Sequence, residues 1–240
     1  GTAEPRSNLP YRLTEFIGRE SEIEAVRDLV TTRRLVTMTG SGGIGKTSLA
    51  IRTATELLTD FPDGVWLVEL ASLTDHVQVP GVIASTIGIE VTPGRSIVDA
   101  LIRGLDGQRV LLIFDNCEHL IDGVARQADA LLRGTGSVRI LTTSREPLRI
   151  DGEATYRVPS LDVPAHDATP DQIAASEGVS LFMDRAALTH AQFRLEGNEQ
   201  PVVDICRHLD GIPLAIELAA ARLDAFTVAQ IAEGLVDRFR

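Results

Sequence analysis

The stretch "TMTGSGGIGKTSL", residues 37–49, matches two phosphate-binding motifs that belong to different folds. Its glycines have the G-x-G-x-x-G spacing of a dinucleotide-binding turn. From Gly40 to Thr47 the same letters also have the G-x-x-x-x-G-K-[ST] spacing of a mononucleotide P-loop. Both motifs need glycine for the same reason, because the backbone approaches phosphate closely and adopts positive φ angles. The glycines alone therefore do not decide between the two folds.

Lys46 and Thr47 favour the P-loop. In a P-loop the ammonium reaches the β- and γ-phosphates and the hydroxyl binds Mg²⁺, whereas the dinucleotide motif has no role for either group. Lys46 is also the single lysine among 23 basic residues, and all the others are arginines. A compact ammonium on a flexible stem can reach the phosphates in a way that a planar guanidinium cannot. The dinucleotide alternative is supported by Glu69, an acid near the end of the next strand.

A second acidic position agrees with the P-loop interpretation. The run "RVLLIFD" (109–115) is continuously apolar, as expected of a strand covered on both faces, and it ends at Asp115. A P-loop protein needs a carboxylate at the end of such a strand to hold Mg²⁺. Lys46, Thr47 and Asp115 together predict a Mg²⁺-nucleotide site. The backbone N–H groups of residues 42–47 would form the anion cradle at the start of a helix.

Hydrophobic periodicity predicts strands that alternate with helices, and then helices alone. The expected strands are 34–39, 64–70, 109–115, 138–144 and 154–159. The expected helices of the first part are 21–30 with Ser21 as N-cap, one starting at Thr47, 76–88, 95–105 and 118–133. Pro159, Pro164 and Pro170 mark a connector, and the helices expected after it are 176–190, 200–209, 213–223 and 227–238. This order predicts an α/β P-loop NTPase with a five-stranded parallel sheet, followed by a smaller all-α domain.

The predicted organisation has three parts. Residues 1–33 form an entry segment, 34–160 the nucleotide-binding domain and 161–240 the helical domain. Because the first residue is not Met, we expect a piece of a longer chain.

The composition limits the function classes. The net charge of −11 argues against direct nucleic-acid binding and gives no support for binding to an anionic membrane. The chain lacks a membrane-length apolar run and the apolar core of a signal peptide, which favours a cytoplasmic protein. Cys117 and Cys206 lack the number and spacing of a disulfide framework or metal site, and we expect two reduced, buried thiols.

With these segments in order, the chain resembles the signal-transduction P-loop ATPases with numerous domains (STAND, NB-ARC-like). The resemblance is greatest to the modules of actinobacterial transcription regulators of the AfsR-like and LuxR-type kinds. The segments that carry it are "NLPYRLTEFIGRE" (8–20), "GSGGIGKTSLA" (40–50), "DGVWLVELASL" (63–73), "LLIFDNCEHL" (111–120), "RILTTSREPL" (139–148), "VPSLDVP" (158–164) and "LDGIPLAIELAAARL" (209–223).

The resemblance implies roles that the spacing alone does not. Arg145, just past the expected strand 138–144, would sense the γ-phosphate. Without the resemblance, a surface arginine that caps a loop is the alternative interpretation. The "FIGRE" segment would lie beside the adenine and ribose, and Pro213 of "GIPLA" would pack on the adenine, between the α/β and helical domains. The residues predicted to contact nucleotide are Ile17, Gly18, Arg19, Gly40, Ser41, Gly42, Gly43, Ile44, Gly45, Lys46, Thr47, Ser48 and Pro213, with Thr47 and Asp115 on the metal.

One departure from the family concerns hydrolysis. Many relatives carry a second acid directly after the Mg²⁺ aspartate, but this chain has Asn116. An amide is not a general base at neutral pH, so efficient hydrolysis loses its usual water activator. Glu118 and Glu69 are the candidate replacements, and we place Glu118 with Lys46 and Arg145 among the catalytic residues. For His119 we expect a solvated or helix-capping side chain.

These observations predict an ATP/ADP-binding switch module of a multidomain bacterial transcription regulator, with ATP or ADP and Mg²⁺ as ligands and weak ATPase activity. The expected partners are other domains of the parent chain, namely a winged-helix, a DNA-binding helix-turn-helix or an N-terminal effector domain. Nucleotide-dependent self-association is a further candidate. The alternatives are an efficiently hydrolysing AAA+-type motor or loader, a dinucleotide-binding oxidoreductase and a scaffold that binds no nucleotide.

Overall fold

The computed structural model describes residues 6–11, 14–92 and 94–238. Residues 12 and 13 of the "NLPYRLTEFIGRE" segment lie outside these ranges. So do residues 1–5 of the predicted entry segment and residues 239–240 of the predicted helical domain. By its contacts the chain forms two compact units. The first contains residues up to Thr14, Glu20–Ser41 and Lys46–Val158, and the second contains Glu15–Arg19, Gly42–Gly45 and the chain from Pro159 onward. The three predicted domain ranges stay a prediction.

The first unit contains a five-stranded parallel sheet with the strand order β2-β3-β4-β1-β5. The strands are β1 (Leu35–Thr39), β2 (Gly64–Glu69), β3 (Val110–Asp115), β4 (Arg139–Ser144) and β5 (Glu153–Arg157). The prediction of a five-stranded parallel sheet is confirmed. Because the strands are parallel, their carboxyl ends lie along one edge, where α/β folds bind their ligands.

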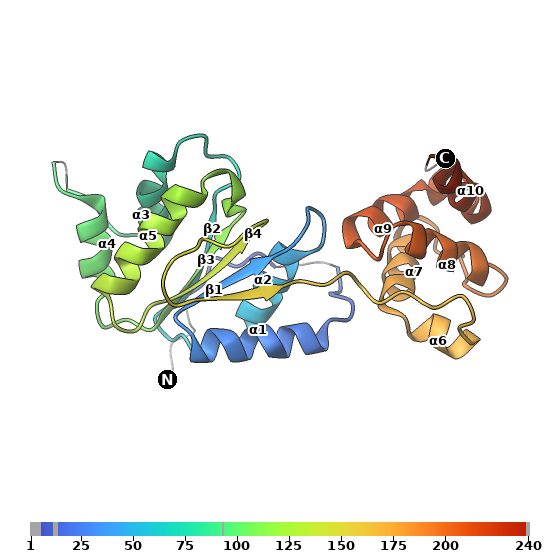
Figure 1. Cartoon of the computed structure of the whole chain (residues 1–240), viewed down its shortest axis with the longest axis horizontal. Helices are drawn as coiled ribbons and strands as arrows, with labels where there is room; N and C mark the ends of the chain where they lie inside the picture. The colour runs from blue at the N-terminus through green and yellow to red at the C-terminus, as the bar shows by residue number, and fades with distance from the viewer. Residues whose placement is uncertain (1–5, 12–13, 93, 239–240) are drawn as a thin grey trace. The chain divides into compact units, whose positions relative to one another are not determined.

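Helices cover both faces of this sheet (Figure 1). They are α1 (Glu20–Thr32), α2 (Lys46–Glu56), α3 (Val79–Ile87), α4 (Ile97–Leu105) and α5 (Ile121–Gly134), with short 3₁₀ turns η1 (His76–Gln78) and η2 (Cys117–His119). α1 and α2 pack on each other and on β1. α3, α4 and α5 bury their apolar residues against the other face, on Leu112 and Phe114 of β3. Strand β3, an inner strand of the sheet, is thus buried on both sides.

The start of α1 differs from the prediction. The helix begins at Glu20, so Ser21 lies within its first turn and is not the N-cap; its hydroxyl donates to the Glu22 carboxylate at 2.9 Å. The reason is the backbone before the helix, where Gly18 and Arg19 both have left-handed φ angles, of 65° and 66°. This turn directs the chain into the helix at Glu20, two residues before the helix start that a Ser21 cap would give.

The free edge of β2 is covered by the N-terminal segment. Arg6 O accepts the Val65 N–H at 2.9 Å. The Asn8 side-chain amide accepts the Leu67 N–H at 2.7 Å and donates to Leu67 O at 2.9 Å. Asn8 therefore uses its side chain to copy the two hydrogen bonds that a neighbouring strand would make.

The second unit is helical apart from its short segments Glu15–Arg19 and Gly42–Gly45. Its helices are α6 (Pro170–Ala175), α7 (Glu177–Thr189), α8 (Glu199–His208), α9 (Pro213–Ala220), the 3₁₀ turn η3 (Ala221–Asp224) and α10 (Val228–Arg238). Phe182 of α7 lies at the centre of its core and meets Phe193 edge to face, with 6.0 Å between ring centroids. The all-α second part is confirmed, although α6 falls in a stretch that we expect to be a connector.

Two remaining expectations concern the cysteines and membranes. Cys117 and Cys206 are free and buried, and burial raises the pKa of both thiols, that of Cys206 to about 12. Within the ranges that the structure covers, no helix has the length and apolar character needed to cross a bilayer.

Candidate functional site

The glycine-rich loop connects β1 to α2 at the carboxyl edge of the sheet. β1 ends at Thr39 and α2 begins at Lys46, so the loop leads directly into a helix N-terminus. Gly43 and Gly45 have positive φ angles of 77° and 92°, which glycine adopts without steric cost. A Cβ atom at Gly43 would lie 3.0 Å from the Leu214 Cβ, so both conformation and space require glycine there. Ile44 is buried and anchors the loop.

Lys46, in the first turn of α2, folds its side chain back over this loop. The ammonium donates to Gly40 O at 2.8 Å and to Ser41 O at 3.0 Å. Burial, as the largest cause, lowers the pKa of Lys46, and the charge of Arg145 adds to this effect. The carboxylates of Glu118 and Asp115 act in the opposite direction. Two acids and an arginine predicted as site residues thus lie within electrostatic range of this ammonium.

Asp115 connects three strands at the same edge. Its Oδ1 atom accepts a hydrogen bond from the Thr47 hydroxyl at 2.7 Å and a second from the Thr143 hydroxyl at 2.6 Å. Thr47 follows β1, Asp115 ends β3, and Thr143 belongs to β4, which lies between those two strands. The fold therefore brings Thr47 and Asp115 together although they are 68 residues apart in sequence.

Thr143 is a site residue that the sequence analysis missed. Its side chain is 1% exposed, and its hydroxyl also accepts the backbone N–H of Asn116 at 2.9 Å. Asn116 has a φ angle of 63°, a left-handed conformation that asparagine tolerates better than most residues. Thr143 thus fixes both Asp115 and the turn that follows it. The available signal was a hydroxyl residue near the end of a strand, but its meaning depends on the strand order.

Replacing Thr143 with valine keeps the side-chain shape and removes the hydroxyl. We expect the free energy of unfolding to fall by about 1–3 kcal/mol, because the Asn116 N–H loses its acceptor and Asp115 loses a donor in a half-buried place. Urea unfolding followed by circular dichroism would measure the loss. Thr143→Ser retains the hydroxyl and should be clearly more stable than Thr143→Val; equal stabilities would show that the hydroxyl is unimportant.

Glu118 and Arg145, predicted for separate roles, form an ion pair. Arg145 follows β4 and Glu118 lies in η2, and the Arg145 Nε atom is 3.2 Å from Glu118 Oε1. The Glu118 side chain is 20% exposed and the Arg145 side chain 68% exposed. Arg145 therefore holds one oxygen of the carboxylate that we consider as a water activator.

The other polar candidates nearby are placed differently. Glu69 ends β2 beside Asp115 in the sheet register, and it is exposed. His119 is exposed, and its Nε2 atom lies 3.1 Å from Leu70 O and 3.0 Å from Leu73 O. His119 therefore contacts the loop after β2 and does not cap a helix.

A second group of predicted residues lies within the second unit. Ile17 packs on the helical core, and Arg19 is 3% exposed. The Arg19 guanidinium donates to Pro159 O at 3.0 Å. A Cβ atom on Gly45 would lie 3.4 Å from Arg19 Nη1 and 3.8 Å from Pro213 Cγ. Arg19 and Pro213, which begins α9, thus both lie against Gly45. Of the remaining predicted residues, Ser41 and Gly42 are exposed and Ser48 is half-buried.

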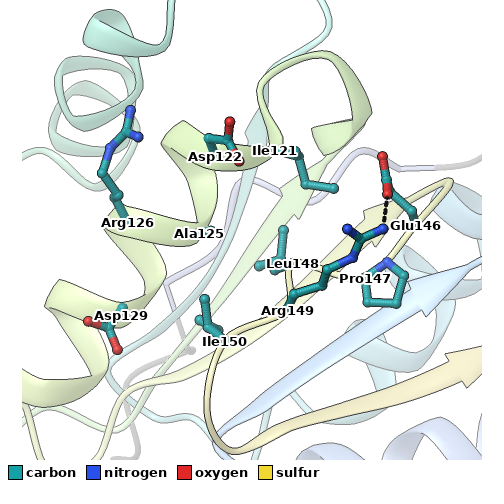
Figure 2. Close-up of a pocket in the computed structure, with 10 residues that line it drawn as sticks. All are labelled: Ile121, Asp122, Ala125, Arg126, Asp129, Glu146, Pro147, Leu148, Arg149 and Ile150. Carbon is teal, nitrogen blue, oxygen red and sulfur yellow. Dashed lines mark hydrogen bonds and ion pairs between the residues drawn. The ribbon is translucent and has the colours of Figure 1, made fainter.

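A surface cavity of about 500 Å³ lies elsewhere on the first unit, between α5 and the loop after β4. Figure 2 shows its apolar floor, with Ile121 from α5 and Leu148 and Ile150 from the loop. The ion pair between Glu146 and Arg149 lies along one wall. The described residues that line it include no predicted nucleotide ligand. The site is therefore defined by the loop and its partners, and not by this cavity.

The donor set fits a nucleoside phosphate and Mg²⁺. An ammonium at a helix N-terminus suits phosphate, and the Thr47 hydroxyl and Asp115 carboxylate are the oxygen ligands that Mg²⁺ prefers. In the described part of the chain, no group of three or more His, Cys, Asp or Glu residues could hold a metal. In nucleotide sites Mg²⁺ binds through one or two protein ligands plus phosphate oxygens.

The chain has relatives among bacterial regulators, although no protein-family model matches it. It is 41% identical over 229 residues to an uncharacterized protein of Mycobacterium tuberculosis. This alignment covers 95% of this chain and 56% of the relative. It is 42% identical over 216 residues to a candidate HTH-type transcriptional regulator of the same species, covering 90% and 23%. It is 29% identical to the regulatory protein AfsR of Streptomyces coelicolor, covering 98% and 24%. The chain thus spans about half or less of these relatives.

Solved structures share the fold. A STAND protein with a tetratricopeptide repeat sensor from Pyrococcus horikoshii matches all of this chain and 34% of its own, with a TM-score of 0.54 and 18% identity. Domain III of the replication initiation protein DnaA from Thermotoga maritima matches 93% of this chain and 94% of its own, with a TM-score of 0.57 and 12% identity.

The fold is that of a P-loop NTPase. More particularly, the chain is a relative of a region of AfsR-like and HTH-type transcription regulators and shares its fold with a STAND protein. The resemblance inferred from the motifs is therefore confirmed. The similarity supports a nucleotide-binding module of a regulator.

Proposed function

We propose that this chain is an ATP/ADP-binding switch module of a multidomain bacterial transcription regulator, with slow or conditional ATP hydrolysis. The observation that carries the proposal is the cluster of Lys46, Thr47 and Asp115 at the carboxyl edge of the sheet. These three residues provide an ammonium for phosphate and two oxygen ligands for Mg²⁺, directly beside a helix N-terminus. The acidic charge of the chain supports the proposal that another domain of the parent protein binds DNA.

The phosphates would be held by the loop backbone and Lys46. The Lys46 ammonium already lies over the loop, on Gly40 O and Ser41 O, so a short movement of a flexible side chain exchanges these carbonyls for phosphate oxygens. Thr47 and Asp115 would hold Mg²⁺, and Thr143 keeps Asp115 in place. When bound, Mg²⁺ would neutralise phosphate charge and the nucleotide would supply the γ-phosphoryl group.

Slow hydrolysis follows from the groups around Asp115. Asn116 cannot act as a base at neutral pH. Glu118 is an alternative acid whose charge acts on Lys46, but one of its oxygens is held by Arg145. If Arg145 moves to the γ-phosphate, as the resemblance implies, the same movement releases Glu118. Turnover would therefore depend on which group Arg145 contacts.

The adenosine end would contact Ile17, Arg19 and Pro213. Arg19 and Pro213 lie against Gly45, the last glycine before the phosphate-binding lysine. ADP would favour a closed, monomeric arrangement of the parent protein and ATP an open one able to self-associate. Such a switch requires that the two arrangements differ in their affinities for the two nucleotides, because equal affinities shift no population. We place this module in the cytoplasm, together with the regulator that contains it.

The test starts with the purified chain. We expect that denaturation releases bound ADP, identified by chromatography, and that Mg-ATP turnover is very slow. Brisk turnover that Lys46→Ala abolishes would instead support an AAA+-type motor. Tight binding of a dinucleotide without adenine mononucleotide, or no binding of any nucleotide, would refute the proposal. Thermal shift gives a first readout, because ligand at 100 times its dissociation constant should stabilise the fold by about 2.7 kcal/mol.

The role of Glu118 has its own test. We expect Glu118→Gln to lower the residual ATP turnover at least about tenfold, because a general base typically contributes a factor of 10² to 10⁴. The affinity for ADP should stay the same, since glutamine keeps the side-chain shape. Glu69→Gln is the matched control, because Glu69 is the other candidate acid. A loss of turnover in Glu69→Gln alone would assign the role to Glu69.

A further inference from the structure

Glu177 joins three segments of the second unit through one carboxylate. It is the first residue of α7, and its Oε1 atom accepts the backbone N–H of Arg19 at 2.6 Å. Its Oε2 atom accepts the backbone N–H of Asp162 at 3.3 Å. The same carboxylate lies against Gly18, where any side chain would collide with it. The predicted nucleotide-contacting segment is therefore attached to α7 by this residue.

The attachment determines where Arg19 lies. Gly18 and Arg19 have consecutive left-handed φ angles, which is an unfavourable conformation for arginine. The hydrogen bond from the Arg19 N–H to Glu177 holds the backbone in that conformation. The side chain then runs through the buried interior, donates to Pro159 O and reaches Gly45. Without the carboxylate, the left-handed turn has lost the acceptor that offsets its strain.

We propose that Glu177 is a positioning residue that holds Arg19 at the adenosine end of the nucleotide site. The inference rests on the proposed function. A carboxylate is needed because two backbone N–H groups, from Arg19 and Asp162, donate to its two oxygens. A glutamine has one acceptor oxygen, and its NH₂ group would face the second N–H. Glu177→Gln removes the negative charge and one acceptor, so it should weaken the hydrogen bonds to both segments, including the one that holds Arg19, while it keeps the side-chain volume.

The effect should be specific to the nucleoside part of the ligand. Glu177 acts through Arg19, whereas the phosphates depend on the loop and Lys46. We expect Glu177→Gln to raise the Kd for ADP about tenfold and to leave the Kd for inorganic triphosphate within twofold. In an Arg19→Ala background, Glu177→Gln should change the Kd for ADP less than twofold, because the group that it positions is absent. Both constants can be measured by isothermal titration calorimetry.

Glu199→Gln is the matched control. Glu199 begins α8 as Glu177 begins α7, so both substitutions remove a negative charge from a helix N-terminus. We expect Glu199→Gln to leave the Kd for ADP unchanged. An unchanged Kd in Glu177→Gln, or an equal effect of this substitution with and without the Arg19 side chain, would overturn the proposal.

A readout without ligand separates this proposal from the proposed function. Hydrogen–deuterium exchange of the peptide that contains Arg19 should be slow in the natural sequence and at least tenfold faster in Glu177→Gln, while the α2 peptide keeps its protection. If the chain binds no nucleotide but this exchange difference appears, the proposed function has failed and Glu177 still positions Arg19. If ADP binds and the exchange rate of Arg19 is unchanged, the positioning role is wrong.

Discussion

Lys46→Ala is expected to raise the Kd for ADP and ATP about 100-fold, which corresponds to about 2.7 kcal/mol of binding free energy. The ammonium lies beside the loop on Gly40 O and Ser41 O, and no other lysine exists in the chain to replace it. Phosphate oxygens carry the largest charge of the ligand, so the loss of this cation should weaken binding of both nucleotides. Calorimetric titration in the presence of Mg²⁺ would measure the change.

Two further variants make this result specific. Lys46→Arg restores the charge with a planar group that cannot follow the same path, and we expect it to recover less than a tenth of the lost affinity. Arg52→Ala removes a cation from the same helix, where Arg52 pairs with Glu56 at the surface, and it should leave binding unchanged. ADP binding by Lys46→Ala within threefold of the natural sequence would contradict the assignment of the loop as the phosphate site.

Gly211→Ala is expected to lower the free energy of unfolding of the helical unit by about 3 kcal/mol. Gly211 has a φ angle of 64°, where a Cβ costs about 1–2 kcal/mol, and the Cβ would also collide with the carbonyl oxygen of Leu161. The backbone there has little freedom to move, because the Leu161 N–H donates to Gly211 O at 2.9 Å. Relieving the overlap should cost a further 1–3 kcal/mol.

The measurement is urea unfolding followed by circular dichroism, with separate transitions allowed for the two units. Gly234→Ala is the control. Gly234 lies in α10, and an added Cβ would meet no atom within 4 Å. This substitution should stabilise the helix by about 0.5–1 kcal/mol, because alanine loses less conformational entropy than glycine. If Gly211→Ala unfolds at the same urea concentration as the natural sequence, the tight turn before α9 is not as rigid as it appears in the structure.

Local signals in the sequence predicted most of the elements. β1 and β3 are recognisable as apolar runs that end near a glycine or a polar residue, and the loop at Gly40 identifies β1 as the strand that precedes it. α6 was missed although it carries a complete signal: Thr169 and Gln172 form a capping box around Pro170. Pro170 by itself fits a connector, but proline is also common at the first position of a helix.

The strand order could not be predicted from the sequence, and the site contacts that depend on this order could not be predicted either. β4 lies between β1 and β3, and only this arrangement places Thr143 beside Asp115. The ion pair between Glu118 and Arg145 depends on the same order, since the two residues follow neighbouring strands. Glu177 was missed for another reason, because an acid in the first turn of a helix is common and gives no sign of a distant partner.

The segment around Asn8 has a consequence for how this module can be isolated. Its amide and Arg6 O satisfy the hydrogen-bonding groups of Val65 and Leu67 along the outermost strand. A shorter version that starts after Asn8 would present β2 to solvent with these groups unpaired, and an uncovered parallel edge recruits strands from other molecules. Protection against intermolecular strand pairing is thus supplied by Arg6 and Asn8, two residues that lie outside the P-loop and the FIGRE segment.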